Sequence, residues 1–289
     1  MLEKKRIFII ISLIIIGIFI ALLLTLYEDK LILKEQKIKV ENKYSPFKNT
    51  SNFKIENKER YVAFYENNKD LSYEKVVTYV NIGLDKEFYS YIKNTDPSKG
   101  ILILVNKYQK LTSDYTPNDL EEINSKYFIN GNSRVRMLRK EAKENFEKLS
   151  EASIKNNTPV YGQSAYRSYQ SQETLYNNAV NTNGKEKADI DTARPGHSEH
   201  QTGLTIDVSS TKNGNMLEFG NTASYYWMIE NAHKYGFILR YPQGKEKIHG
   251  FINEPWHYRY VGIETATDMH NNHSNLTFDE YYYKYIDNK

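Results

Sequence analysis

The 289-residue chain contains no cysteine. This absence excludes disulfide bonds, zinc sites built from thiolates, anchoring through a lipidated cysteine, and thiol nucleophiles. Any metal ion that the protein binds must therefore be held by nitrogen and oxygen ligands.

The chain also has little excess charge. Its net charge is +3, of which Glu3, Lys4, Lys5 and Arg6 together contribute +2, so residues 7–289 carry only +1. A nucleic-acid-binding protein shows a basic patch or stripe, and this sequence has none. We expect no nucleic-acid partner, and nothing in the sequence demands an obligate protein partner.

One long hydrophobic run is present, over residues 7–27, and it contains no charged residue. About 20 such residues suffice to cross the hydrocarbon core of a bilayer. Lys4, Lys5 and Arg6 lie just before it, which favours a cytoplasmic N-terminus. We therefore predict a single-pass protein of the cell membrane whose main domain is extracytoplasmic. The alternative is a cleaved signal peptide, but the run is longer than a typical signal core and no small-x-small cleavage pattern follows it.

Composition divides the chain into four parts. Residues 1–27 form the predicted cytoplasmic stub and anchor, and residues 28–52, rich in Lys, Glu and Asn, suit a solvated extracytoplasmic spacer. Residues 53–110 mix short apolar runs with polar turns and indicate a small N-terminal elaboration. Residues 111–289 form the predicted main domain.

Hydrophobic periodicity in the main domain predicts both helices and strands. Apolar residues three or four apart predict a helix over 133–153, and further helices are expected over 171–180, from 222 to Gly236, and after Thr277, where Glu280 completes a capping box. Strands are expected over 159–166, 204–208, 237–241 and 256–261. This irregular order predicts an α+β domain with a mainly antiparallel sheet and flanking helices.

Two short clusters carry the chemistry: His200 with Asp207, and Glu254 with His257. Two histidines and one carboxylate are the three protein ligands of a catalytic zinc ion, whose fourth position stays open for water, and the spare carboxylate is a candidate base. Either cluster alone is weak evidence, because a histidine near an aspartate is usually a surface pair. Together, inside Gly-flanked hydrophobic segments and beside Trp256, they are much stronger evidence.

The spacing of these residues sets two structural requirements. A turn at residues 201–203 must bring His200 and Asp207 together. On a straight strand, Glu254 and His257 would point to opposite faces, so a bend at Pro255 is needed for both to face one metal ion.

At these residues the sequence resembles the VanY-type D-alanyl-D-alanine carboxypeptidases, which belong to a zinc peptidase group that also includes the VanX dipeptidases and the hedgehog-like fold. The residues that carry the resemblance are Ser198, His200, Gly203 and Asp207, followed by Glu254, Trp256 and His257. It extends to residues 165–172, 193–197 and 258–262. Two departures are Thr205, where the motif has alanine, and Ala165, where it has glycine.

The resemblance implies a role for each matching residue. His200, Asp207 and His257 would bind Zn²⁺, and Glu254 would act first as base and then as acid toward the leaving amine. Arg167 would stabilise the carbonyl oxygen or the substrate carboxylate. The expected hydrogen-bonding partners of the substrate's C-terminal end are Gln172 and Ser198.

The expected function is removal of the terminal D-alanine from a peptidoglycan stem peptide or its precursor. A D,D-dipeptidase and an L,D-carboxypeptidase of the same fold are the alternatives among enzymes; the anchor and spacer favour a polymeric substrate outside the membrane. A non-catalytic cell-wall-binding module is the alternative from another class. The presence of Glu254 and Arg167 favours an enzyme.

Overall fold

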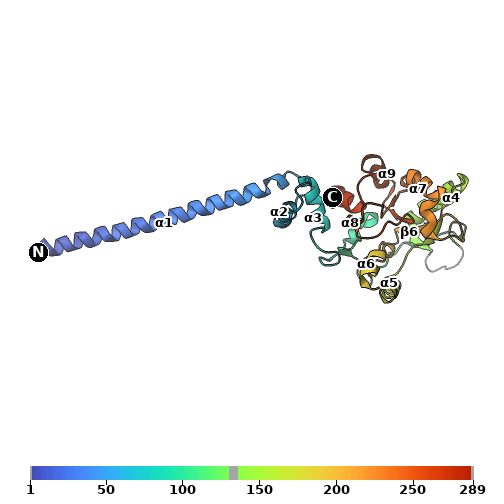
Figure 1. Cartoon of the computed structure of the whole chain (residues 1–289), viewed down its shortest axis with the longest axis horizontal. Helices are drawn as coiled ribbons and strands as arrows, with labels where there is room; N and C mark the ends of the chain where they lie inside the picture. Colours follow the sequence, from blue (N-terminus) through green and yellow to red (C-terminus); the bar gives the residue numbers. More distant parts are fainter. Residues whose placement is uncertain (1, 130–135, 288–289) are drawn as a thin grey trace. The chain divides into compact units, whose positions relative to one another are not determined.

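The computed structural model describes the backbone of residues 2–129 and 136–287, and the side chains of these residues except 2–15 and 36–42. The chain divides into two compact units, Met1–Val77 and Thr78–Lys289. Figure 1 labels some of the helices and strands with the names used below.

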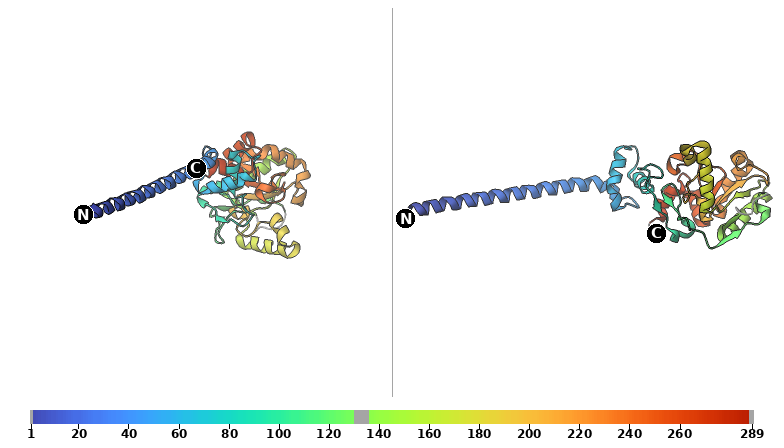
Figure 2. Two further views of the ribbon diagram at one scale, coloured as in Figure 1. Left: turned by 60° about the vertical axis from the view of Figure 1, so that its left-hand side comes forward. Right: turned by 90° about the horizontal axis from the view of Figure 1, so that it is seen from below.

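The first unit is helical. A single helix, α1 (Leu2–Lys48), is followed by a short 3-10 turn, η1 (Ile55–Asn57), and by α2 (Lys58–Glu66). At the end of α1 the ring of Phe47 is buried and stacks on Tyr61, with 5.9 Å between the ring centroids. Residues 28–48, which the sequence analysis assigns to a spacer, continue this helix, as the views in Figure 2 also show.

The predicted single-pass membrane helix, and the cell-membrane location that rested on it, are wrong. Within the residues that the structure describes, no helix combines the length and the apolar character that crossing a bilayer requires.

The second unit contains both helices and strands. Along the chain, α3 (Tyr73–Ile82) begins in the first unit and ends in the second. Two small sheets come first in the chain: β1 (Lys93–Asn94) pairs in parallel with β2 (Gln109–Lys110), and β3 (Leu120–Glu122) pairs antiparallel with β4 (Met137–Arg139). The longer helices are α4 (Lys140–Lys155), α5 (Tyr169–Asn183), α6 (Lys185–Asp191), α7 (Ala223–Asn231) and α9 (Ile263–Asn272). The short helical segments are η2 (Pro97–Leu102), η3 (Ser125–Tyr127), η5 (Glu199–Thr202), η6 (Met216–Asn221), η7 (Ala232–Tyr235), α8 (Glu246–His249), α10 (Phe278–Tyr281) and η8 (Tyr282–Ile286).

The central sheet has four strands in the order β5 (Tyr161–Ser164), β6 (Thr205–Ser209), β8 (His257–Tyr260) and β7 (Phe237–Leu239). Every neighbouring pair in it is antiparallel. The mixed architecture and the antiparallel central sheet therefore agree with the sequence analysis, although the predicted membrane helix does not.

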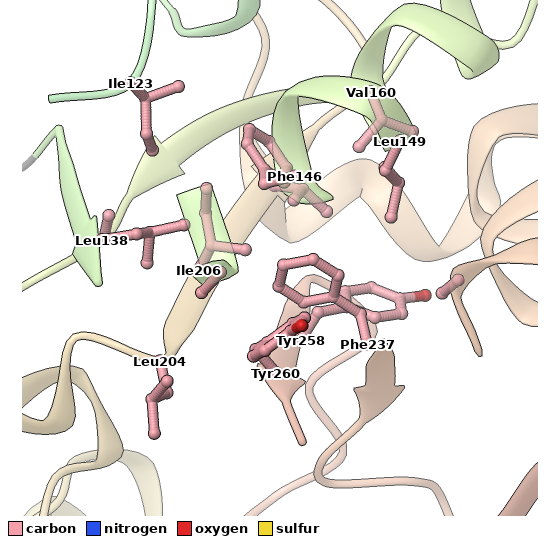
Figure 3. Packing of buried hydrophobic residues seen from close by; sticks show 14 of the residues in the cluster. Ile123, Leu138, Phe146, Leu149, Val160, Leu204, Ile206, Phe237, Tyr258 and Tyr260 are labelled. Carbon is pink, nitrogen blue, oxygen red and sulfur yellow. The ribbon is translucent and has the colours of Figure 1, made fainter. Parts of the chain in front are cut away.

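Side chains alternate across this sheet and separate the core from the functional face. On β6 the core face carries Ile206 and Val208, both fully buried, while Asp207 projects to the opposite face. On β8 the same alternation places Tyr258 and Tyr260 in the core cluster. Figure 3 shows Phe146 of α4, Ile206 and Phe237 gathered in this core.

Two predicted helices differ from the observed ones at their ends. The helix expected over 133–153 begins only at Lys140, because Met137–Arg139 pairs with β3 instead, and residues 133–135 lie outside the described residues. The terminal helix starts as predicted, with the Thr277–Glu280 capping box complete, but it continues as a π-helix over Tyr282–Ile286.

Candidate active site

His200, Asp207 and His257 come together on the functional face of the sheet. One ligand atom from each lies within 4.8 Å of the others, and all three residues are buried. The antiparallel register sets Asp207 of β6 directly opposite His257 at the start of β8. Their side chains therefore emerge side by side from adjacent strands.

A tight turn adds His200 to this pair. His200 lies on η5, which ends at Gly203, and Gly203 has a left-handed backbone with φ of 68°. The left-handed backbone conformation favours glycine here, and a Cβ would lie 2.7 Å from Leu120 Cδ2, so that side chain would have to move. The turn predicted at residues 201–203 is thus the element that brings His200 to Asp207.

Glu254 reaches the same place through a second turn. The His257 backbone N–H donates to the Glu254 carbonyl at 3.1 Å, which closes the chain around Pro255. The bend expected at Pro255 is present, and it places Glu254 Oε2 3.3 Å from His257 Nδ1.

The hydrogen-bond partners of His200 determine which of its nitrogens can bind a metal. Nδ1 lies 2.7 Å from the Ala165 carbonyl oxygen, which can only accept, so Nδ1 carries the hydrogen. Burial lowers the pKa of His200, which favours the neutral ring. The Nε2 lone pair of His200 therefore faces Asp207 Oδ2 at 3.3 Å. Because both atoms are acceptors, a cation bound between them would interact favourably with both.

Asp207 and His257 complete the donor set. Asp207 Oδ1 is a buried oxygen without a hydrogen bond and lies 3.2 Å from His257 Nδ1. Burial by itself would raise the pKa of Asp207, but His200 and His257 outweigh it and hold this pKa well below its usual range. Two imidazole nitrogens and an ionised carboxylate are a fitting donor set for Zn²⁺.

The pKa of Glu254 is shifted in the opposite direction to that of Asp207. Burial raises the pKa of Glu254 to about 7, against the opposing effect of His257. A carboxyl group with a pKa near the working pH is suited to take up and return a proton. Asp207 stays ionised as a ligand, whereas Glu254 can serve in proton transfer.

Arg167 lies beside this cluster and is held in one orientation. Its Nη1 donates to Gln172 Oε1 at 2.8 Å and its Nη2 to Ser164 Oγ at 2.9 Å, while Nη2 lies 4.0 Å from Asp207 Oδ2. Gln172 is itself fixed, because its Nε2 donates to the Ala193 carbonyl at 2.7 Å. Both ends of the Gln172 amide are therefore engaged within the protein.

A cavity of about 370 Å³ opens over these residues. Its polar lining includes Arg167, Gln172, Ser198, Glu254 and the three clustered side chains. Apolar side chains form the remaining wall, among them Leu175, Met216, Leu217, Ile252 and Trp256. All seven residues predicted as site residues thus line one cavity.

Comparisons with known proteins agree with this geometry. The family model described as VanY, D-alanyl-D-alanine carboxypeptidase, matches residues 135–263. YodJ of Bacillus subtilis (strain 168) is 39% identical over 209 residues, which are 70% of this chain and 76% of YodJ. The chain belongs to the VanY family of D-alanyl-D-alanine carboxypeptidases.

Two solved structures extend the comparison. The LdcB LD-carboxypeptidase is 39% identical, with a TM-score of 0.61 over 69% of this chain and 92% of that one. A mutant of the vancomycin-resistance D,D-pentapeptidase VanY, in complex with Zn(II), is 33% identical, with a TM-score of 0.52 over 62% of this chain and 97% of that one.

These findings establish the activity and the cofactor of this VanY family member. It is a zinc-dependent D-Ala-D-Ala carboxypeptidase, as the sequence analysis predicted. The group of residues able to hold the metal is His200, Asp207 and His257.

One further group at the site, Glu199, was not among the residues predicted from the sequence. Its carboxylate is completely buried and its Oε2 lies 3.6 Å from His257 Nε2. Burial would raise the pKa of Glu199, but Arg240 and Arg259 outweigh it and lower the pKa far below its usual range. The two arginines lie 41 and 60 residues further along the chain, so nothing local in the sequence distinguished Glu199 from an ordinary surface glutamate.

Proposed function

We propose that the protein removes the terminal D-alanine from a peptidoglycan stem peptide, with Glu254 as the proton-transferring residue. The observation that carries the proposal is the position of Glu254, whose carboxylate adjoins the His200, Asp207 and His257 cluster inside a single cavity. Its raised pKa, about 7, supports the same role.

The three clustered residues hold the zinc ion in this proposal. When bound there, zinc supplies Lewis acidity, which makes water more acidic and polarises a carbonyl. Glu254 takes the proton from the attacking water and returns it to the nitrogen of the departing D-alanine. The same carboxylate is thus ionised for the first transfer and protonated for the second.

Arg167 stabilises negative charge on the substrate in this proposal. Its guanidinium presents several donors in a rigid plane, and the bonds to Gln172 and Ser164 fix the direction of that plane. Gln172 then acts through Arg167, because its own amide is engaged at both ends. Ser198, which lines the cavity, is the proposed partner of the substrate's terminal carboxylate.

A second candidate is an L,D-carboxypeptidase that trims a tetrapeptide stem. The likeness to the LdcB LD-carboxypeptidase, whose TM-score is 0.61, favours it. The two candidates share the residues above and differ in the stereochemistry of the penultimate residue.

The test uses the full chain with zinc, incubated separately with a muramyl pentapeptide and a muramyl tetrapeptide, with products identified by mass spectrometry. Loss of one D-alanine from the pentapeptide supports the proposed function, and cleavage of the tetrapeptide alone supports the second candidate. The Glu254→Gln variant keeps the size of the side chain but cannot accept the proton. We expect it to bind zinc as tightly as the wild type and to lose at least 100-fold in kcat, the lower part of the range for general acid–base catalysis. Wild-type turnover in this variant would contradict the role of Glu254.

A further inference from the structure

His257 has two different neighbours on the two sides of its ring. Its Nδ1 lies 3.2 Å from Asp207 Oδ1 and 3.3 Å from Glu254 Oε2, so this nitrogen faces the metal cluster. Its Nε2 faces away from the cluster, toward Glu199 Oε2 at 3.6 Å. The ring therefore bridges the cluster and Glu199.

The free oxygen of Glu199 is directed to this contact by its other bonds. Arg240 Nε and Arg259 Nη1 both donate to Glu199 Oε1, each at 2.8 Å. Glu199 Oε2 and His257 Nε2 are both buried atoms without another hydrogen-bond partner among the described residues. Each is thus left available to the other.

The two arginines that bind Glu199 are themselves held by further hydrogen bonds. Arg240 Nη1 donates to Asp279 Oδ2 at 2.6 Å, and Asp279 accepts from Asn106 at 2.7 Å. Arg259 Nη2 donates to the carbonyls of Ile103 and Ile101, at 2.7 and 3.0 Å. Both guanidinium groups are completely buried.

We propose that Glu199 is a positioning residue, which holds the His257 ring with Nε2–H toward itself and the Nδ1 lone pair toward the metal. A metal-binding histidine whose other nitrogen donates to a carboxylate has its tautomer and orientation fixed, and it becomes a more basic ligand. Loss of such a partner costs roughly 10- to 100-fold in metal affinity. The proposal rests on the assignment of His257 as a zinc ligand.

The test compares two variants that remove one negative charge from the same buried network. Glu199→Gln removes it next to His257, and Asp279→Asn removes it on the far side of Arg240. Zinc dissociation constants are measured on the metal-free full chain by competition with a chromophoric chelator. We expect Glu199→Gln to weaken zinc binding by roughly 10- to 100-fold and Asp279→Asn to bind zinc as the wild type does, although both variants are less stable.

A third variant and a spectroscopic measurement separate positioning from folding. Glu199→Asp keeps the charge that neutralises the arginines but withdraws the carboxylate from His257, so it too should bind zinc more weakly. In the Co²⁺-substituted proteins, the visible absorption bands should change in both Glu199 variants and stay unchanged in Asp279→Asn. Wild-type zinc affinity and Co²⁺ spectra in Glu199→Gln and Glu199→Asp would overturn the proposal, as would equal losses in Asp279→Asn. If the Ala variants of His200 and His257 bind zinc as tightly as the wild type, or if the wild type binds none, the ligand assignment fails instead.

Discussion

Acidification should destabilise the second unit through two buried histidines, His197 and His249. Their exposed fractions are 3% and 2%. Burial is the main reason why the pKa of each falls from 6.5 to about 4. In the folded state His197 Nδ1 lies 2.8 Å from the Asn106 carbonyl oxygen, so the neutral ring donates there.

The sign of the effect follows from these values. Between pH 6.5 and 4 the unfolded chain binds a proton at each histidine that the folded chain does not bind, so the free energy of unfolding falls as the pH falls through this window. The difference between 6.5 and about 4 is about 2.5 pKa units, and each unit corresponds to about 1.36 kcal/mol. The full effect is about 3 kcal/mol per histidine, of which about 2 kcal/mol is reached at pH 5.

Urea unfolding at pH 7 and pH 5 measures this loss. Both tryptophans, Trp227 and Trp256, lie in the second unit, so their fluorescence reports its unfolding. The His197→Gln variant keeps an amide donor for Asn106 but does not titrate. Its loss of stability between pH 7 and pH 5 should be about 2 kcal/mol smaller than that of the wild type, while contributions from the metal site cancel in the comparison. An identical pH dependence in the two proteins would refute the reasoning.

Two further predictions concern the site. Arg167→Lys keeps the charge but loses the planar guanidinium that Gln172 and Ser164 orient. We expect kcat/KM for the pentapeptide to fall by roughly 100-fold. Steady-state kinetics at saturating zinc measure this value, and a fall of less than threefold would argue that Arg167 is not a fixed donor. Gly203→Ala places a side chain on a left-handed backbone and against Leu120. We expect the free energy of unfolding, measured by urea titration, to fall by at least about 1–2 kcal/mol, and zinc binding, measured by chelator competition, to weaken. Wild-type values of both would show that the turn tolerates a Cβ.

The metal cluster could be predicted because its residues lie in two short segments with strong local signals. His200, Gly203 and Asp207 fall within one turn and strand, and Glu254 and His257 within one bend. The structure adds the register that sets Asp207 opposite His257, and that register depends on pairing between strands about fifty residues apart. No local pattern carries this information.

Other features could not be predicted because tertiary contacts decide them. Met137–Arg139 continues a helical hydrophobic period, yet it pairs with β3. The sequence did not show that the Gln172 amide also contacts Arg167 and the Ala193 carbonyl, and its predicted contact with substrate stays a prediction. The apolar run near the N-terminus predicted a membrane helix from hydropathy alone, but no helix among the described residues meets the requirements for crossing a bilayer.

The pairing of Arg240 with Asp279 has a consequence for synthesis of the chain. The three clustered residues have all been translated once the ribosome passes His257, yet Arg240 gains its second carboxylate only with Asp279 of α10. A nascent chain that stops between these two points contains Glu199, the carboxylate that accepts from both Arg240 and Arg259, but lacks Asp279. The zinc ligands are thus complete in the nascent chain before the arginine network behind them has both of its carboxylates.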